Sequence, residues 1–179
     1  MEGSRVNAFD MVSTETTDRT LMSWEEYETL GPEVRSEYID GEMVLMSLPT
    51  GPHQDICTRL WQRLDEAMPD GVGARLSWGW KPGQDEFGPD VIVFDETEEK
   101  KRYTGLPHLA VEVLSTDRAR DLVRKFAKYA AAGLPRYWVI DPDGPELWAF
   151  ELIAGAYREQ GHYGPDDLAD MDIGPARVS

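Results

Sequence analysis

A β-α-β unit in the second half of the chain constrains the fold more than any other feature. Residues 109–114 (LAVEVL) and 136–140 (RYWVI) are apolar on both faces, which is typical of strands in the middle of a covered sheet. Between them, residues 119–132 carry apolar side chains at helical spacing, and Gly133 and Pro135 end that helix. Two strands joined by one helix run parallel with a right-handed crossover. The sequence therefore predicts an α/β domain whose sheet contains a parallel pair.

The other patterns predict a mixed sheet flanked by helices, with a β-hairpin near the N-terminus. Asp40-Gly41 separates two β-prone runs, which is a strong hairpin signal, and Ser23 with Glu26 forms a capping box that begins a short helix. The connections between most strands are short, so we expect them to pair antiparallel. The remaining expected elements are helices at residues 24–30 and 53–68, strands at 74–80, 90–94 and 146–152, and an edge strand around Tyr157.

Length and composition indicate one ordinary domain. The chain has 179 residues; residues 1–20 are polar without periodicity and are expected to be flexible, and residues 21–179 are expected to form a single domain. Cys57 is the one cysteine, which excludes an intramolecular disulfide and a zinc site built from several cysteines. No apolar run reaches the roughly 20 residues that cross a bilayer, and the N-terminus lacks a secretory signal. We therefore expect a cytoplasmic protein with no membrane partner.

Charge is unevenly distributed along the chain. The net charge of −16 argues against a protein that coats nucleic acid through bulk electrostatics. Residues 100–136, however, hold nine of the eighteen basic residues and only three acids, which gives this segment a net charge of +6. A solvated helix face and a phosphate-binding surface both explain such a segment, and charge alone does not decide between them.

Two acidic residues in apolar surroundings are the main candidates for chemistry. Glu112 lies inside LAVEVL, and an isolated buried carboxylate costs several kcal/mol, so it must be paired, protonated or bound to a metal. Asp90 opens a second strand that is apolar on both faces. If these strands are neighbours, about 4.8 Å apart, the two carboxylates can share one ion. The alternatives are a salt bridge between Glu112 and an arginine, and a turn aspartate at Asp90, but the two acids together favour a metal site.

Several other polar side chains are candidates for the same site, and each of them also has a purely structural explanation. Glu42 follows the hairpin turn and is either a third carboxylate of the site or a solvent-facing residue. His53 lies at the centre of the apolar stripe of its helix, as an accessory residue or as a cap on the core. Lys125, at the border of a buried helix face, either reaches the strand ends with its ammonium or lies on the surface. Asp121, one turn earlier, is close enough to pair with Lys125.

The order of these motifs resembles the PD-(D/E)XK, or restriction-endonuclease-like, nuclease superfamily. More closely, YIDGE, GPHQDI, GPDVIVF, LAVEVLS and RDLVRKFAKYAAAGLPRYWVIDP resemble the Uma-type family of bacterial restriction endonucleases, over residues 22–152. This resemblance implies a restriction-endonuclease-like core and hydrolysis of phosphodiester bonds in DNA, with Mg²⁺ or Mn²⁺ as the cofactor.

The resemblance also implies a role for each candidate. Asp90 and Glu112 would bind the metal with the backbone carbonyl of Val113, and Glu42 would be an accessory acid. The superfamily's lysine usually stands two residues after the second acid, where this sequence has Leu114. The Uma-type family is similar but carries that lysine on the following helix, so Lys125 would be the catalytic lysine. Basic side chains of the same segment would hold the DNA backbone, namely Arg118, Arg120, Arg124 and Lys128.

Other functions stay open from the sequence. One alternative is a non-catalytic nucleic-acid-binding or regulatory module that retains the fold, because folds do not dictate function. Another is an enzyme that cleaves a smaller phosphodiester. Motifs of several rival enzyme classes, G-x-x-x-x-G-K-[ST], G-x-S-x-G and H-E-x-x-H, are absent from the sequence. The sequence leaves open whether the chain acts as a monomer or as a homodimer.

Overall fold

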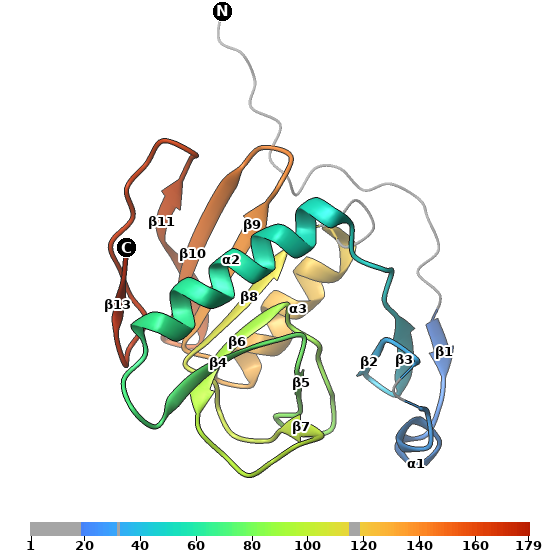
Figure 1. Cartoon of the computed structure of the whole chain (residues 1–179). Helices are drawn as coiled ribbons and strands as arrows, with labels where there is room; N and C mark the ends of the chain where they lie inside the picture. Colours follow the sequence, from blue (N-terminus) through green and yellow to red (C-terminus); the bar gives the residue numbers. More distant parts are fainter. Residues whose placement is uncertain (1–18, 32, 115–118) are drawn as a thin grey trace, which may run out of the picture.

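A mixed sheet with one helix on each face forms the body of the protein (Figure 1). The computed structural model describes residues 19–31, 33–114 and 119–179, without the side chains of residues 119–121. Six strands make up this sheet in the order β11-β10-β9-β8-β6-β4. They are β4 (Val72–Leu76), β6 (Val91–Asp95), β8 (Leu109–Val113), β9 (Arg136–Asp141), β10 (Glu146–Ile153) and β11 (Ala156–Tyr163).

The predicted β-α-β unit lies at the centre of this sheet. Strands β8 and β9 are parallel neighbours, with Glu112 opposite Val139, and helix α3 (Ala119–Ala131) joins them. The other neighbouring pairs are antiparallel, so the prediction of a mixed α/β sheet flanked by helices is confirmed. Gly133 adopts a φ of +80°, the left-handed conformation that commonly ends a helix.

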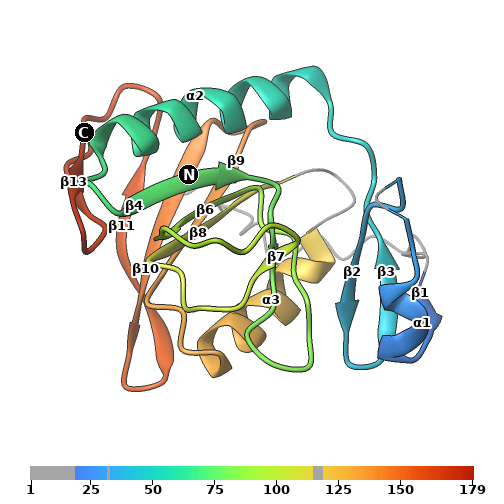
Figure 2. The same cartoon turned by 60° about the horizontal axis from the view of Figure 1, so that its bottom comes forward.

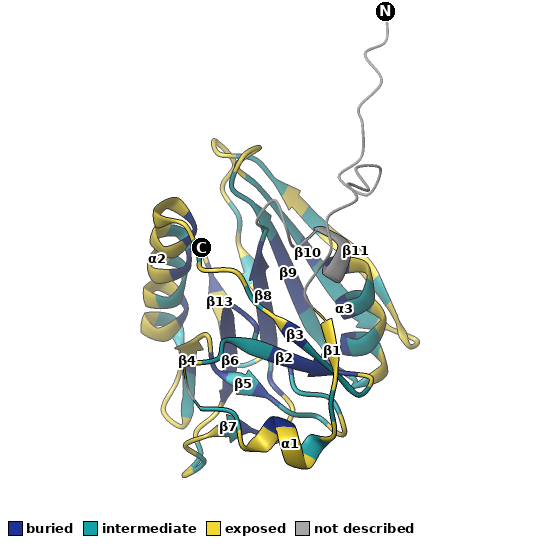
Figure 3. Ribbon diagram, turned by 90° about the vertical axis from the view of Figure 1, so that its right-hand side faces the viewer, coloured by how far each residue is buried: buried dark blue, intermediate teal, exposed yellow. Residues whose placement is uncertain are grey.

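The second long helix, α2 (Gly51–Ala67), covers the opposite face of the sheet from α3 (Figure 2). Its first turn is capped by Thr50, whose side chain accepts a hydrogen bond from the His53 N–H. Leu64 of α2 belongs to one buried cluster with Val91 and Val111 of the sheet. A second cluster, which is rich in aromatic residues, contains side chains of α3 and of the sheet. Strands β8 and β9 are buried between the two helices (Figure 3), as their apolar sequences predict.

A smaller antiparallel sheet with the order β1-β3-β2 packs beside this body. The predicted hairpin is formed by β2 (Ser36–Ile39) and β3 (Glu42–Leu45). Its turn residues Asp40 and Gly41 have φ values of 55° and 80°, which matches the two-residue turn that Asp-Gly favours. The predicted capping box begins α1 (Trp24–Glu28). Arg19 and Thr20, expected in the flexible segment, instead lie in β1 (Arg19–Leu21), which pairs with β3; residues 1–18 lie outside the described residues.

One expected strand is divided in two. Residues 74–80 were expected to form one strand, but β4 ends at Leu76 and β5 (Gly79–Trp80) pairs with β7 (Arg102–Tyr103). Ser77 between them has a φ of 47°, a left-handed conformation that a regular strand cannot contain. The chain ends in a two-stranded ribbon of β12 (Met171–Asp172) and β13 (Arg177–Val178). In the part of the chain that the structure describes, every helix is too short or too polar to cross a membrane.

Candidate active site

Asp90 and Glu112 lie next to each other at the ends of neighbouring strands. Strand β6 pairs with β8, so the prediction that the two strands are neighbours is confirmed. The Asp90 N–H donates to the Val111 carbonyl at 3.0 Å, and the Val113 N–H donates to Asp90 Oδ2 at 2.9 Å. Asp90 is therefore bonded to backbone groups on both sides of Glu112. Both acids are buried, with exposed fractions of 2% and 3%.

Lys125 of α3 brings its ammonium to Glu112. Its Nζ lies 2.9 Å from Glu112 Oε1, and the whole residue is buried. The wheel of the helix placed Lys125 at the edge of the apolar face, and the packing of α3 on the sheet carries the ammonium inward. Lys125 is thus a buried partner of Glu112 rather than a surface lysine. Glu112 thus forms an ion pair with this lysine, whereas the alternative expected an arginine.

Glu37 was missed from the sequence. It lies on β2, is buried, and its Oε1 accepts from the Lys125 ammonium at 2.7 Å and from the Gly88 N–H at 2.7 Å. A signal was available: side chains two residues apart share one face of a strand, and Ile39, two positions after Glu37, is fully buried.

Glu42, the predicted acid of this hairpin, has a different environment. Its carboxylate lies 3.1 Å from Arg19 and 3.5 Å from Arg124, in a half-buried position. Among the described contacts, the hairpin acid that reaches Lys125 is Glu37. The difference arises because the turn places Glu42 at the end of the hairpin, beside basic side chains of β1 and α3.

Three buried carboxylates belong to this part of the protein, and one buried ammonium contacts two of them, Glu37 and Glu112. Glu37, Asp90 and Glu112 carry three negative charges when ionised, and Lys125 offsets one of them. Buried charge of one sign is costly unless it is compensated, and carboxylate and carbonyl oxygens are the ligands that Mg²⁺ and Mn²⁺ prefer. The donor chemistry of Asp90 and Glu112 therefore fits a hard divalent cation.

Tyr129 fixes the orientation of Glu112. Its hydroxyl donates to Glu112 Oε1 at 2.9 Å from one turn further along α3. Burial raises the pKa of Tyr129 well above its ordinary value of 10, and the Glu112 carboxylate acts in the same direction. The phenol therefore keeps its proton at neutral pH and remains a donor. Glu112 is held from the same side by a hydroxyl and an ammonium.

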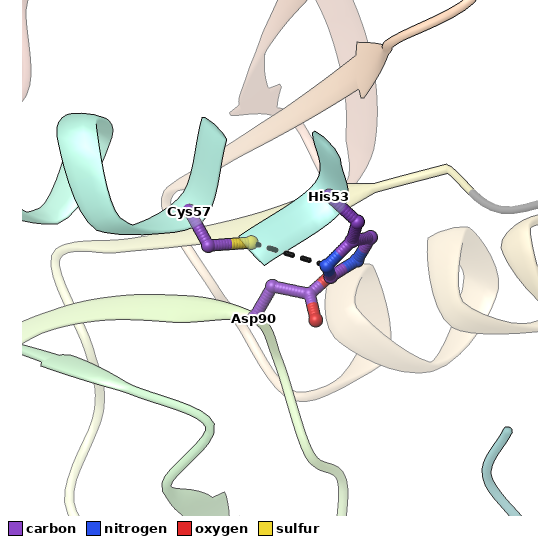
Figure 4. Close-up of side chains that lie close together, drawn as sticks. All are labelled: His53, Cys57 and Asp90. Carbon is purple, nitrogen blue, oxygen red and sulfur yellow. Dashed lines mark hydrogen bonds and ion pairs between the residues drawn. The ribbon is translucent and has the colours of Figure 1, made fainter. Parts of the chain in front are cut away.

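His53 approaches the site from α2. Its Nε2 lies 3.3 Å from Asp90 Oδ2, and its Nδ1 lies 3.5 Å from the Sγ of Cys57 (Figure 4). All three residues are buried. The histidine thus contacts a predicted metal-binding acid directly, in addition to its place at the end of the core.

Two of the residues predicted to contact DNA, Arg124 and Lys128, have side chains that the structure describes, and both are paired with acids. Arg124 binds Asp40 at 2.7 Å and the Ile39 carbonyl at 3.1 Å, and Lys128 forms ion pairs with Asp40 and, at 2.8 Å, with Asp85. Both cations therefore attach α3 to the turn of the N-terminal hairpin, and Lys128 also attaches it to Asp85, between β5 and β6. The remaining predicted residues cannot be placed in this way: Arg118 lies outside the described residues, as do the side chains of Arg120 and Asp121.

Comparison with known proteins agrees with this architecture. A family model named Uma2 and described as "Putative restriction endonuclease" matches residues 24–176. The chain belongs to the Uma2 family. The resemblance inferred from the sequence is therefore confirmed, and the match extends beyond residue 152 to residue 176, which follows β12. A comparison with curated proteins finds no match.

A solved structure shares the fold of this Uma2-family chain. It is a crystal structure from Anabaena variabilis, described as "a putative nuclease belonging to DUF820". The two structures are similar with a TM-score of 0.69 and 21% sequence identity, over 83% of this chain and 88% of that chain. This likeness shows that the two chains share a fold.

Proposed function

We propose that this Uma2-family protein is a metal-dependent endonuclease that hydrolyses phosphodiester bonds in DNA. The observation that carries the proposal is the buried contact of Lys125 with Glu112, beside Asp90, at the end of the central β-α-β unit. Two acids followed by a lysine have the order of the superfamily's motif, although the lysine here lies on the following helix and not two residues after the second acid. Their burial in one place supports a catalytic role because a set of isolated charges would be costly there.

Asp90 and Glu112 would hold the ion, Mg²⁺ or Mn²⁺, together with the Val113 carbonyl that follows Glu112 in β8. When bound, the ion supplies Lewis-acid stabilisation of the negative charge that develops on the phosphate. Asp90 is fixed for this role by its bond from the Val113 N–H, and Glu112 by Tyr129.

Lys125 would act on the attacking water and on the developing charge. Glu37 and Glu112 hold its ammonium from two sides, which fixes the position of a flexible side chain before substrate binds. Such preorganised positive charge is worth more in a buried site than in water. We therefore propose Glu37 as the acid that positions Lys125, and as the hairpin acid of the site in place of Glu42, which was expected to be an accessory acid.

A non-catalytic nucleic-acid-binding or regulatory module is the second candidate. The pairing of Arg124 and Lys128 with Asp40 and Asp85 favours the regulatory form of this candidate, because cations held by acids contribute less to binding phosphate. In that case the buried charges would have a structural role alone.

Plasmid nicking distinguishes these candidates. The parent protein with Mg²⁺ or Mn²⁺ is expected to convert supercoiled plasmid to open circles, and Asp90→Asn is expected to be inactive. Asp95→Asn is the matched control, since Asp95 forms a similar pair with His108, at 2.8 Å, on the protein surface. A parent protein that binds the plasmid without cleaving it under either ion supports the binding module, and cleavage of bis(p-nitrophenyl) phosphate alone indicates a smaller substrate.

A further inference from the structure

His53, Cys57 and Asp90 form a second group of potential metal ligands beside the proposed nuclease site. One ligand atom from each lies within 4.8 Å of the other two (Figure 4). The histidine and cysteine are four residues apart on α2, which places them on one face of the helix, and Asp90 reaches them from the end of β6. All three side chains are buried.

The spacing of these atoms is close to what a tetrahedral ion requires. Zinc binds sulfur at about 2.3 Å, and nitrogen or oxygen at about 2.0–2.2 Å, so its ligand atoms lie roughly 3.3–3.8 Å apart. In the structure His53 Nε2 lies 3.3 Å from Asp90 Oδ2, whereas it is His53 Nδ1 that lies 3.5 Å from the Cys57 Sγ. One ion can take only one of these two nitrogens, and one ligand atom of each residue lies within 4.8 Å of the other two. Side-chain rotations that close this spacing would direct one nitrogen, one sulfur and one oxygen at a common point.

The ligand chemistry differs from that of the acidic site. A thiolate and an imidazole suit Zn²⁺ and Co²⁺, whereas Mg²⁺ prefers oxygen ligands alone. We propose that His53, Cys57 and Asp90 bind one Zn²⁺-type ion, with the fourth position left to water. Cys57 binds as the thiolate, and its proton passes to solvent when the ion enters.

Asp90 belongs to both ligand groups, and this predicts competition. An ion held by Cys57 and His53 engages the carboxylate that the nuclease proposal assigns to Mg²⁺. Zn²⁺ is then expected to inhibit cleavage rather than support it. This consequence rests on the proposed nuclease function, whereas the binding of Zn²⁺ or Co²⁺ does not.

Co²⁺ titration of the intact protein tests the site without an activity assay. Cobalt bound to a thiolate absorbs in the near ultraviolet, and Cys57 is the one cysteine of the chain, so this absorption reports Cys57 without any substitution. The parent protein is expected to develop the band with one equivalent of Co²⁺ and to lose it when Zn²⁺ is added. Co²⁺ binding without a thiolate band, or no binding at all, would overturn the proposal and leave the cluster as a set of structural hydrogen bonds.

Substitutions identify the remaining ligands and separate the two sites. His53→Gln and Asp90→Asn are each expected to weaken Co²⁺ binding at least about tenfold, and His108→Gln is expected to leave it unchanged. Glu112→Gln should remove Mn²⁺ binding and keep the cobalt–thiolate band, whereas Cys57→Ser should do the reverse. Circular dichroism checks that each variant is folded. A band that persists in His53→Gln and Asp90→Asn alike contradicts the site, whatever the nuclease assay shows.

Discussion

Replacement of Lys125 by methionine tests the buried charge cluster through stability. Methionine keeps much of the side-chain volume but removes the ammonium that lies 2.7 Å from Glu37 and 2.9 Å from Glu112. Loss of one partner of a buried ion pair costs about 3–5 kcal/mol, because the other charge is left buried without compensation. For a chain of this length, that loss corresponds to a fall in Tm of roughly 6–20 °C. We expect Lys125→Met to remain folded at low temperature, to unfold at much lower urea concentration, and to lose cleavage.

Lys128→Met is the matched control for this prediction. Lys128 lies one turn later on α3 and also contacts two acids, but its side chain is 27% exposed and Asp40 is 52% exposed. Exposed ion pairs contribute about 1 kcal/mol or less, so this variant is expected to stay close to the parent. Adding Glu37→Gln to Lys125→Met should recover about 1–3 kcal/mol, since the repulsion between two unpaired carboxylates is relieved. Equal urea midpoints for Lys125→Met and Lys128→Met would refute the argument.

Two further predictions concern groups around the site. Tyr129→Phe removes the hydroxyl that donates to Glu112 and is expected to cost about 1–2 kcal/mol in thermal unfolding, whereas Tyr137→Phe should cost less, because the buried Tyr137 hydroxyl has no hydrogen-bond partner among the described residues. A larger loss from Tyr137→Phe would contradict this. Asp40→Asn keeps a residue that tolerates the positive φ and loosens Arg124, so DNA should bind more tightly and with a steeper salt dependence in filter binding; unchanged affinity would show that Arg124 does not meet phosphate.

The part of the fold that could be predicted from the sequence follows local patterns. The apolar runs of β8 and β9, the helix between them and the Asp40-Gly41 turn each specify their structure within a few residues, and the structure has all of them. Strand β1 was missed because three exposed residues carry no periodic signal and depend on pairing with β3. The break at Ser77 depends on a backbone angle that the alternation of side chains does not reveal.

The residues of the site that could be predicted from the sequence are the charged residues in otherwise apolar segments. Glu112 and Asp90 stand out as acids in apolar strands, and the structure brings Lys125 to Glu112. Glu37 and Glu42 lie on the same hairpin, and the choice between them depends on how the hairpin docks against α3.

Contacts between segments far apart in the sequence could not be predicted from local patterns. Lys128 meets Asp40, which lies 88 residues earlier in the chain, and helical spacing on α3 gives no information about such a partner. The Cys57–His53 contact is visible as a helical spacing of four, but its meeting with Asp90 depends on how α2 packs on the sheet.

Counting bound Mn²⁺ tests the central claim most directly. The claim is that Asp90 and Glu112 jointly hold one hard divalent cation. Titration of the protein with Mn²⁺, followed by electron paramagnetic resonance of the free ion, is expected to show one tight site per chain. That site should be lost in Asp90→Asn and in Glu112→Gln, and kept in Cys57→Ser and His108→Gln. A parent protein that binds no Mn²⁺ at millimolar concentration, or a site that survives in both acid variants, would contradict the account.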